Sequence, residues 1–329
     1  MADGRSGAGS STGKGAWPDI VVFGAGAVGC HYGAKLALAG APVTLIGRGP
    51  HVEAVRERGL WFDSGGTRRV VRLSADTSPG PVGAADLVLL CVKSSDTAEA
   101  AREIAARLRP GATVVSMQNG VDNVDRARAA APGLDPLAAV VYVGASMGGP
   151  GHVVHAGRGE LVLGAIPGGP GTPDPARVAA VASVFERAGV PCPVSDDLRA
   201  ALWTKLVMNA TFNALSALTR GRYGPLVADA GLAETARDVI DECVAVARAD
   251  GVAIADGATL HAAALALGAA MATATSSTEQ DLARGRPTEI DSLNGYVVAR
   301  GDARGVPVPM NRALHAMVRL LERERAARG

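Results

Sequence analysis

The first half of the chain alternates short apolar runs with segments of helical length. The first run is Ile20–Phe23, followed by a glycine turn, a helical stretch over 28–39 and a second apolar run over 42–46. Continuous apolar runs of about 4 to 8 residues are typical of strands buried on both faces of a sheet. Strands that alternate with helices predict a parallel sheet covered by helices.

This alternation continues to about residue 194. Further strands are predicted at 70–73, 86–92, 112–117, 138–145 and 190–194, and further helices at 96–108 and 177–188. Within the Gly- and Pro-rich region 148–175, the segments 153–155 and 160–164 are predicted as antiparallel additions to the sheet. The first 18 residues are mostly Gly, Ser and Ala, and we predict a disordered tail there.

Beyond residue 196 the pattern changes to helices alone. The segments of helical length are 198–218, 232–250, 260–273, 290–304 and 312–325. We therefore predict an α/β fold with a parallel-sheet domain over 19–195 and an all-helical domain over 196–329. The length of 329 residues fits two domains, because single cores stop growing at about 250–300 residues.

Composition excludes several classes of function. With 33 Lys and Arg against 32 Asp and Glu, the chain lacks the charge bias of a protein that binds nucleic acid or anionic membranes. No apolar run has membrane-spanning length, no signal-peptide core is present, and the histidines show no metal-ligand spacing. The cysteines stand singly in apolar runs, at Cys30, Cys91, Cys192 and Cys243. We expect buried free thiols, a cytoplasmic protein and no metal site.

A glycine-rich turn joins the first predicted strand to the first predicted helix. Its G-x-G-x-x-G pattern consists of Gly24, Ala25, Gly26, Ala27, Val28 and Gly29. In this context the glycines admit a pyrophosphate to the backbone, and the helix N-terminus offers free N–H groups to the phosphates. The pattern predicts a Rossmann-type dinucleotide-binding domain. The alternative is a glycine turn that binds no ligand.

Arg48 stands after the second strand, where an acidic residue would bind the ribose of NAD. A guanidinium suits a 2′-phosphate, and the missing carboxylate removes a repulsion, so the predicted cofactor is NADPH/NADP+. The alternative for Arg48 is a solvated surface arginine.

Lys205, Asn209 and Asn213 recur every four residues and therefore share one side of a helix. The rest of 202–213 is largely apolar, and a buried lysine is unfavourable without partners. The polar row indicates a ligand-lined cleft. The alternative is an amphipathic helix whose polar stripe is solvated.

With these motifs the chain resembles the ketopantoate reductase (2-dehydropantoate 2-reductase) family. The resemblance rests on GAGAVG at 24–29, VKSSDT at 92–97, QNGVDN at 118–123, LWTKLVMNATFNAL at 202–215 and SSTEQDLARGRPTEIDSLNG at 276–295. It implies a Rossmann domain, a helical domain and a site between them. It also implies the NADPH-dependent reduction of a 2-oxo acid, 2-dehydropantoate to pantoate in pantothenate biosynthesis.

The resemblance assigns roles to individual residues. Lys205 matches the catalytic lysine, expected to act as general acid, and Glu289 matches the active-site glutamate. Asn209, Asn213 and Ser277 match substrate contacts, while Lys93 and Asn119 match residues beside the nicotinamide. Each of the less specific positions has a structural alternative: a surface lysine for Lys93, an ordinary turn for Asn119, a helix cap for Ser277 and a first helical turn for Glu289.

Two positions depart from the family pattern on the substrate side. Tyr223 and Ala274 stand where relatives carry asparagines, which leaves fewer amides for pantoate and keeps a different 2-oxo acid or ketone open as substrate. A third reading is a non-catalytic NADP-binding sensor or scaffold, against which the presence of both Lys205 and Glu289 argues. The expected partner is a small-molecule 2-oxo acid, and the oligomeric state is left open, a homodimer included.

Overall fold

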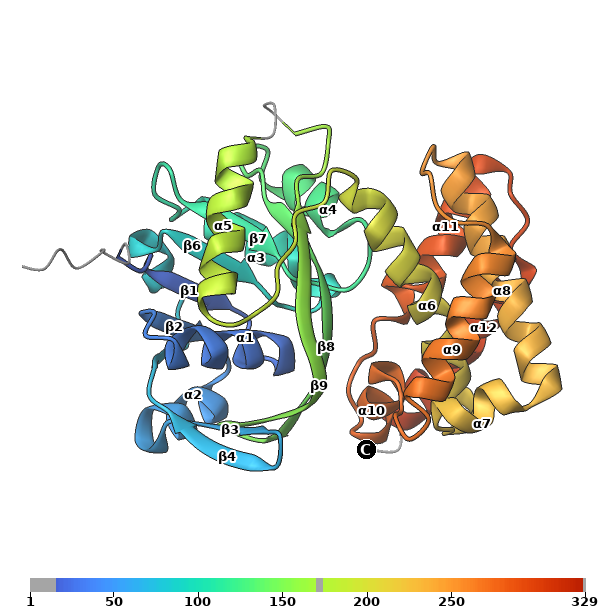
Figure 1. Cartoon of the computed structure of the whole chain (residues 1–329), viewed down its shortest axis with the longest axis horizontal. Helices are drawn as coiled ribbons and strands as arrows, with labels where there is room; N and C mark the ends of the chain where they lie inside the picture. Colours follow the sequence, from blue (N-terminus) through green and yellow to red (C-terminus); the bar gives the residue numbers. More distant parts are fainter. Residues whose placement is uncertain (1–15, 170–173, 328–329) are drawn as a thin grey trace, which may run out of the picture.

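The structure, a computed structural model, describes residues 16–169 and 174–327 of the chain. Figure 1 shows a sheet with its covering helices in the N-terminal part and a group of helices from α6 (Leu198–Thr219) onwards. Most of the predicted tail, residues 1–15, lies outside the described residues. Trp17, near the end of the predicted tail, is among the described residues and packs against the N-terminal core. The Arg187 guanidinium carbon lies 3.8 Å from the centre of its ring.

Parallel strands form the middle of the N-terminal part. They are β1 (Ile20–Phe23), β2 (Val43–Ile46), β5 (Ser74–Asp76), β6 (Leu87–Leu90) and β7 (Thr113–Ser116). Every residue of β1, β6 and β7 is buried. This confirms the interpretation of the apolar runs as strands covered on both faces.

The remaining strands extend this sheet beyond β7. β8 (Leu137–Gly149) pairs in parallel with β7 and forms a long antiparallel hairpin with β9 (His152–Gly164). β3 (Leu60–Ser64) lies parallel to β9 and antiparallel to β4 (Thr67–Val71). The order of the nine strands is β4-β3-β9-β8-β7-β6-β1-β2-β5. The two antiparallel additions predicted from the sequence are thus parts of one strand, β9.

The prediction of a strand at 190–194 is wrong. The structure has only a single bridge there, between Leu163 and Val194. The carbonyls of Pro191 and Pro193 accept hydrogen bonds from Leu161 and Leu163 at 2.9 Å, but a proline has no N–H to donate in return. The segment therefore lies along β9 without forming a regular strand.

Helices cover both faces of the sheet. They are α1 (Ala27–Leu38), α2 (Gly49–Arg58), α3 (Thr97–Ala105), α4 (Asn123–Ala130) and α5 (Pro175–Arg187), with short 3-10 turns η1 (Gly80–Ala84) and η2 (Ser94–Asp96). One apolar core contains Tyr32 of α1 and Phe185 of α5, and the other contains Ile104 of α3 and Ala127 of α4. Two cores on one sheet are what the alternating pattern predicts, and they confirm the α/β fold class.

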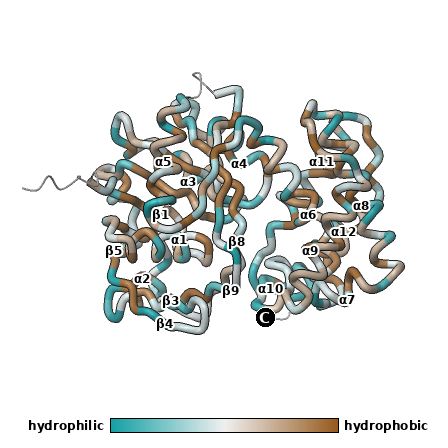
Figure 2. The backbone as a smooth tube through the Cα atoms, in the orientation of Figure 1, coloured by the Kyte–Doolittle hydropathy of each residue, from teal (hydrophilic) through white to brown (hydrophobic). Residues whose placement is uncertain are grey.

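The C-terminal part is helical throughout. After α6 come α7 (Tyr223–Ala228), α8 (Ala230–Ala249), α9 (Gly257–Ala270), α10 (Ser277–Ala283), η3 (Ile290–Ser292), α11 (Asn294–Arg304) and α12 (Pro309–Ala326). The helix predicted over 290–304 is interrupted at Leu293, where φ is −109° and ψ is −103°. Figure 2 shows hydrophobic colour along the central strands and among these helices.

One apolar cluster, which we call the α6 cluster, joins the two parts of the molecule. It contains Trp203, Leu206 and Val207 of α6 together with Ala138 and Val140 of β8. The sheet and the helices are therefore held together by buried apolar surface. Among the described residues, no helix is long and apolar enough to cross a membrane.

Candidate functional site

The glycine loop between β1 and α1 has the geometry of a phosphate-binding turn. Gly24 has φ 113°, and a Cβ there would lie 2.6 Å from the Val92 nitrogen; a Cβ on Gly29 would meet the Gly24 carbonyl oxygen. Neither position admits another residue without movement. Gly26 is the N-cap of α1 without a side-chain cap, and a Cβ there would meet nothing within 4 Å. The helix N-terminus is thus open, and the residues present fit the pyrophosphate of a dinucleotide.

Arg48 lies at the same edge of the sheet as this loop. It is exposed and follows β2, whose residue Ile46 accepts hydrogen bonds from the N–H groups of Gly24 and Ala25 at 3.1 and 2.8 Å. In this position its side chain is free to reach a ligand that extends from the loop across the end of β2. In dinucleotide-binding sheets the residue after the second strand is the one next to the ribose.

Lys205 projects from α6 toward the end of the sheet. Its Nζ donates to Oδ1 of Asn119 at 2.9 Å and to the carbonyl oxygen of Val141 at 2.5 Å, and it lies 5.9 Å from the ring centre of Tyr142. Burial lowers the pKa of Lys205 to about 8; the charge of Glu289 opposes this shift and that of Arg158 adds to it. The lysine is therefore an acid close to neutrality rather than a surface cation.

Asn119 connects Lys205 to Glu289. While its Oδ1 accepts from the lysine, its Nδ2 donates to Oε2 of Glu289 at 3.2 Å. The backbone carbonyl of Asn119 accepts from Nδ2 of Asn123 at 2.6 Å, which holds the turn in place. The structure thus brings together three residues that the sequence predicts separately. The Asn119 amide is held in one orientation, because its oxygen faces a donor, Lys205, and its nitrogen faces an acceptor, Glu289.

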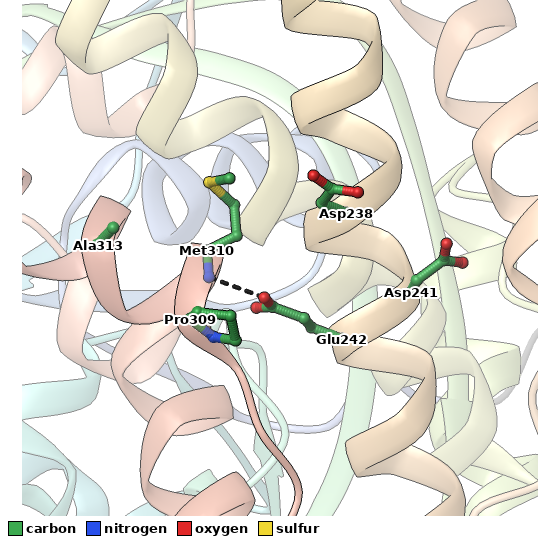
Figure 3. A pocket seen from close by; sticks show the side chains of 6 residues that line it. All are labelled: Asp238, Asp241, Glu242, Pro309, Met310 and Ala313. Atoms are coloured by element: carbon green, nitrogen blue, oxygen red, sulfur yellow. Dashed lines mark hydrogen bonds between the residues drawn. The ribbon is translucent and has the colours of Figure 1, made fainter.

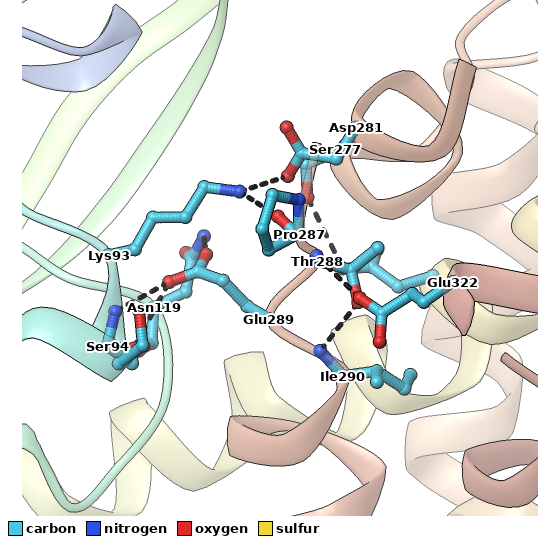
Figure 4. A network of polar contacts seen from close by, with 12 residues as sticks. Lys93, Ser94, Asn119, Ser277, Asp281, Pro287, Thr288, Glu289, Ile290 and Glu322 are labelled. Atoms are coloured by element: carbon cyan, nitrogen blue, oxygen red, sulfur yellow. Dashed lines mark hydrogen bonds and ion pairs between the residues drawn. The ribbon is translucent and has the colours of Figure 1, made fainter. Parts of the chain in front are cut away.

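Ser94 holds the other oxygen of Glu289. Both its backbone N–H and its hydroxyl donate to Oε1 at 3.1 Å, as Figure 4 shows in part. The Glu289 segment is fixed as well, because the Thr288 N–H donates to Glu322 at 2.6 Å. The sequence analysis did not single out Ser94. The available signal was its place directly after Lys93, at the carboxyl end of a parallel strand where sites of α/β sheets gather.

Lys93 contacts the C-terminal part. Its Nζ forms an ion pair with Oδ2 of Asp281 on α10 at 2.7 Å and donates to the carbonyl oxygen of Pro287 (Figure 4). The pair is partly buried. Lys93 therefore lies beside the Asn119 and Glu289 pair and is not a free surface lysine.

The remaining predicted substrate residues lie further along α6 and at the start of α10. Asn213 is buried, and its Nδ2 lies 3.4 Å from Oγ of Ser277, which is exposed. The helix cap is made by Ser276, whose Oγ accepts from the Glu279 N–H at 3.0 Å. Asn209 is half-buried between Lys205 and Asn213 on the same helix face. The side chains of Lys205, Asn209, Asn213 and Ser277 therefore lie on one side of α6.

Tyr223 and Ala274, the two departures from the family pattern, contact each other. The Tyr223 N–H donates to the Ala274 carbonyl at 3.0 Å, and the tyrosine ring stacks on Phe212 with 4.6 Å between centres. Burial raises the pKa of Tyr223 to about 12. This aromatic pair is buried in the apolar core of the helical part.

A separate hollow lies away from these residues. It has a volume of about 480 Å³ and is lined by Asp238, Asp241, Glu242, Pro309, Met310 and Ala313 (Figure 3). Glu242 accepts from the N–H groups of Met310 and Asn311 at 2.7 and 2.9 Å. Its carboxylate therefore caps the N-terminus of α12, which is a structural role.

An open glycine loop at a helix N-terminus and a half-buried lysine at the junction of sheet and helices define a dinucleotide-dependent oxidoreductase of two-part architecture. Residues 20–168 match the family model described as "Ketopantoate reductase PanE/ApbA", and residues 197–322 match the model of its C-terminal region. The chain belongs to the ketopantoate reductase family.

Individual relatives agree with this membership. The chain is 38% identical over 307 residues to a 2-dehydropantoate 2-reductase of Halobacterium salinarum, which covers 93% of this chain and 99% of the relative. A crystal structure of a PanE/ApbA family ketopantoate reductase from Ralstonia eutropha is 47% identical, with a TM-score of 0.86 over 93% of this chain and 99% of that one. D-mandelate dehydrogenase, solved with NADH and anilino(oxo)acetate, is 22% identical with a TM-score of 0.84 over 93% and 99%, and shares the fold.

Proposed function

We propose that this protein reduces 2-dehydropantoate to pantoate with NADPH, with Lys205 as the general acid. The observation that carries the proposal is the environment of Lys205: a half-buried lysine whose pKa is lowered to about 8, held through Asn119 beside the carboxylate of Glu289. Family membership and the names of the relatives support the choice of substrate.

The ammonium of Lys205 has a donor left for a substrate. Of its three N–H bonds, one is directed to Asn119 and one to Val141. The third binds the C2 carbonyl oxygen of the 2-oxo acid and polarises it. A bound nicotinamide would supply a hydride to C2. As the carbonyl oxygen gains negative charge it takes the proton from Nζ of Lys205, and solvent reprotonates the amine.

The electrostatics of the site suit this proton transfer. Burial makes the Lys205 ammonium a stronger acid than a solvated lysine, while Glu289 keeps it charged at neutral pH. The Asn119 amide keeps the lysine and the glutamate apart, so the proton of Lys205 stays available to the substrate. Ser94, through its two hydrogen bonds to Glu289, keeps the carboxylate in place.

The remaining site residues divide between the cofactor and the substrate. The Gly24–Gly29 loop, with Ala25, Ala27 and Val28, holds the pyrophosphate, and Arg48 binds the 2′-phosphate, which favours NADPH. Lys93 and Asn119 lie on the nicotinamide side. Asn209, Asn213 and Ser277 bind the hydroxyl side of the substrate. We further propose that the enzyme acts in the cytoplasm in pantothenate biosynthesis. Light scattering would determine its oligomeric state, for which the sequence leaves a homodimer open.

Steady-state oxidation of NADPH with a panel of 2-oxo acids tests the proposal. We expect the highest kcat/KM with 2-dehydropantoate, and a lower one with an aryl 2-oxo acid and with NADH. A preference for the aryl acid would assign a different 2-oxo acid to this chain. Tight NADPH binding without turnover of any acid would assign a sensor or scaffold instead.

A further inference from the structure

Arg158 has an unusual backbone conformation on β9. Its φ is 55°, in the left-handed region, and it stands between Gly157 and Gly159. An L-residue with a long side chain is strained in this region, and observed strain of this kind is concentrated at functional sites. The strand register also shifts between Tyr142 and Val143, where β8 pairs with this segment. The left-handed backbone and the register shift change the direction in which the Arg158 side chain leaves β9, compared with a regular strand.

The side chain of Arg158 lies on the face of the hairpin that is turned toward α6. Its guanidinium carbon is 4.3 Å from the ring centre of Tyr142. Tyr142 and Val162 pack against the α6 cluster, whereas Val141 and Leu161 belong to the core on the α1 and α5 face. Because Tyr142 is on the α6 side, the guanidinium stacked on it is on that side as well.

Arg158 and Lys205 share the ring of Tyr142. The ammonium of Lys205 is 5.9 Å from the ring centre that the guanidinium approaches to 4.3 Å. The guanidinium is also close enough to lower the pKa of the lysine. Both cations therefore lie near Tyr142, on the side of the hairpin that faces α6.

We propose that Arg158 binds the carboxylate of the substrate while Lys205 binds the adjacent carbonyl oxygen. This inference rests on the proposed function, because it assigns the two neighbouring oxygen groups of a 2-oxo acid to the two cations. A guanidinium fits a carboxylate with two parallel hydrogen bonds. Arg158 thereby supplies the carboxylate contact in a chain that has Tyr223 and Ala274 in place of amides.

If Arg158 is released, its present partner Glu160 keeps one hydrogen bond of its own. Nε of Arg158 donates to Oε1 of Glu160 at 2.7 Å, in a pair in which 45% of the arginine side chain is exposed. Oε2 of Glu160 accepts from the Gly159 N–H at 3.1 Å. The exposed ion pair is weak because water screens it, so an incoming carboxylate competes with Glu160 for the guanidinium.

The variants that test this role are Arg158→Asn and Arg158→Lys. Asparagine tolerates the left-handed conformation and removes the cation, so the variant is expected to fold with an unchanged or higher Tm. We expect its KM for 2-dehydropantoate to rise at least about tenfold, with kcat within about twofold and an unchanged Kd for NADPH. Arg158→Lys is expected to have an intermediate KM. The control is Arg312→Asn, which removes an exposed arginine of α12 that pairs with Asp302 of α11 and should leave the KM unchanged.

A second measurement separates carboxylate recognition from a structural effect. The 2-oxo acid that the wild-type enzyme reduces best and its uncharged primary amide are compared in both proteins. Arg158→Asn should lower kcat/KM for the acid and leave that for the amide unchanged. An unaltered acid-to-amide ratio, or a Kd for NADPH that rises in parallel with KM, overturns the role of Arg158. A wild-type enzyme that reduces no 2-oxo acid overturns the proposed function itself.

Discussion

Lys205 and Glu289 are linked through the side-chain amide of Asn119. The ammonium donates to its Oδ1 at 2.9 Å, and its Nδ2 donates to the carboxylate at 3.2 Å. The arrangement orients the lysine by a neutral group and still exposes it to the field of the glutamate. An acid in such a setting is charged but not neutralised by a direct ion pair, which suits proton donation to a nascent alkoxide.

Replacing Lys205 with alanine should abolish most of the turnover and spare cofactor binding. The variant loses the proton donor and the group that polarises the carbonyl, so kcat should fall by about 100- to 10,000-fold. Steady-state NADPH oxidation measures the loss of kcat, and fluorescence titration of NADPH checks that the Kd is within about threefold of wild type. Near-normal turnover in Lys205→Ala would exclude the general-acid role.

The rate of reduction should fall as the pH rises through the pKa of Lys205. Since that pKa is about 8 and the protonated form is the active one, activity is full below this value and lost above it. Glu289 raises the pKa of the lysine, so Glu289→Gln should move the fall to lower pH. Asn119→Asp adds a negative charge beside Nζ and should move it to higher pH. Profiles of kcat/KM for the three proteins measure these shifts, and coincident profiles would contradict the assignment.

Arg48 should decide between the two nicotinamide cofactors. Arg48→Glu replaces a cation by an anion where the 2′-phosphate is expected, so the Kd for NADPH should rise by about tenfold or more while that for NADH changes little. Arg69→Glu is the matched control, because Arg69 is an exposed arginine on β4. Retained preference for NADPH in Arg48→Glu would leave Arg48 as a solvated surface residue.

Alanine substitutions at two glycines of the nucleotide loop should affect NADPH affinity and protein stability separately. A Cβ on Gly26 meets no atom within 4 Å, so Gly26→Ala should keep its Tm and lose NADPH affinity by obstructing the pyrophosphate. A Cβ on Gly29 meets the Gly24 carbonyl oxygen, so Gly29→Ala should lower the free energy of unfolding by about 1–3 kcal/mol. Calorimetry and NADPH titration on both variants measure this. Equal losses of Tm in the two would show that Gly26 is structural as well.

Local patterns were sufficient for several parts of this protein. The apolar runs of β1, β6 and β7 and the helical length of α6 follow from periodicity, which acts within a few residues. The four-residue spacing puts Lys205, Asn209 and Asn213 on one helix face in any fold that keeps the helix. The glycine loop is equally local, because its function requires backbone freedom at fixed positions after a strand.

Other features arise only when distant segments meet. Glu289 contacts Asn119 across 170 residues of sequence and Ser94 across 195, so no spacing rule could reveal either contact. The choice of Ser276 over Ser277 as helix cap, the interruption before α11 and the loss of the strand at 190–194 depend on which backbone groups find partners. Arg158 is one of many arginines in the sequence. Its backbone strain and its place on Tyr142 exist only because β8 and β9 pair with a shifted register beside α6.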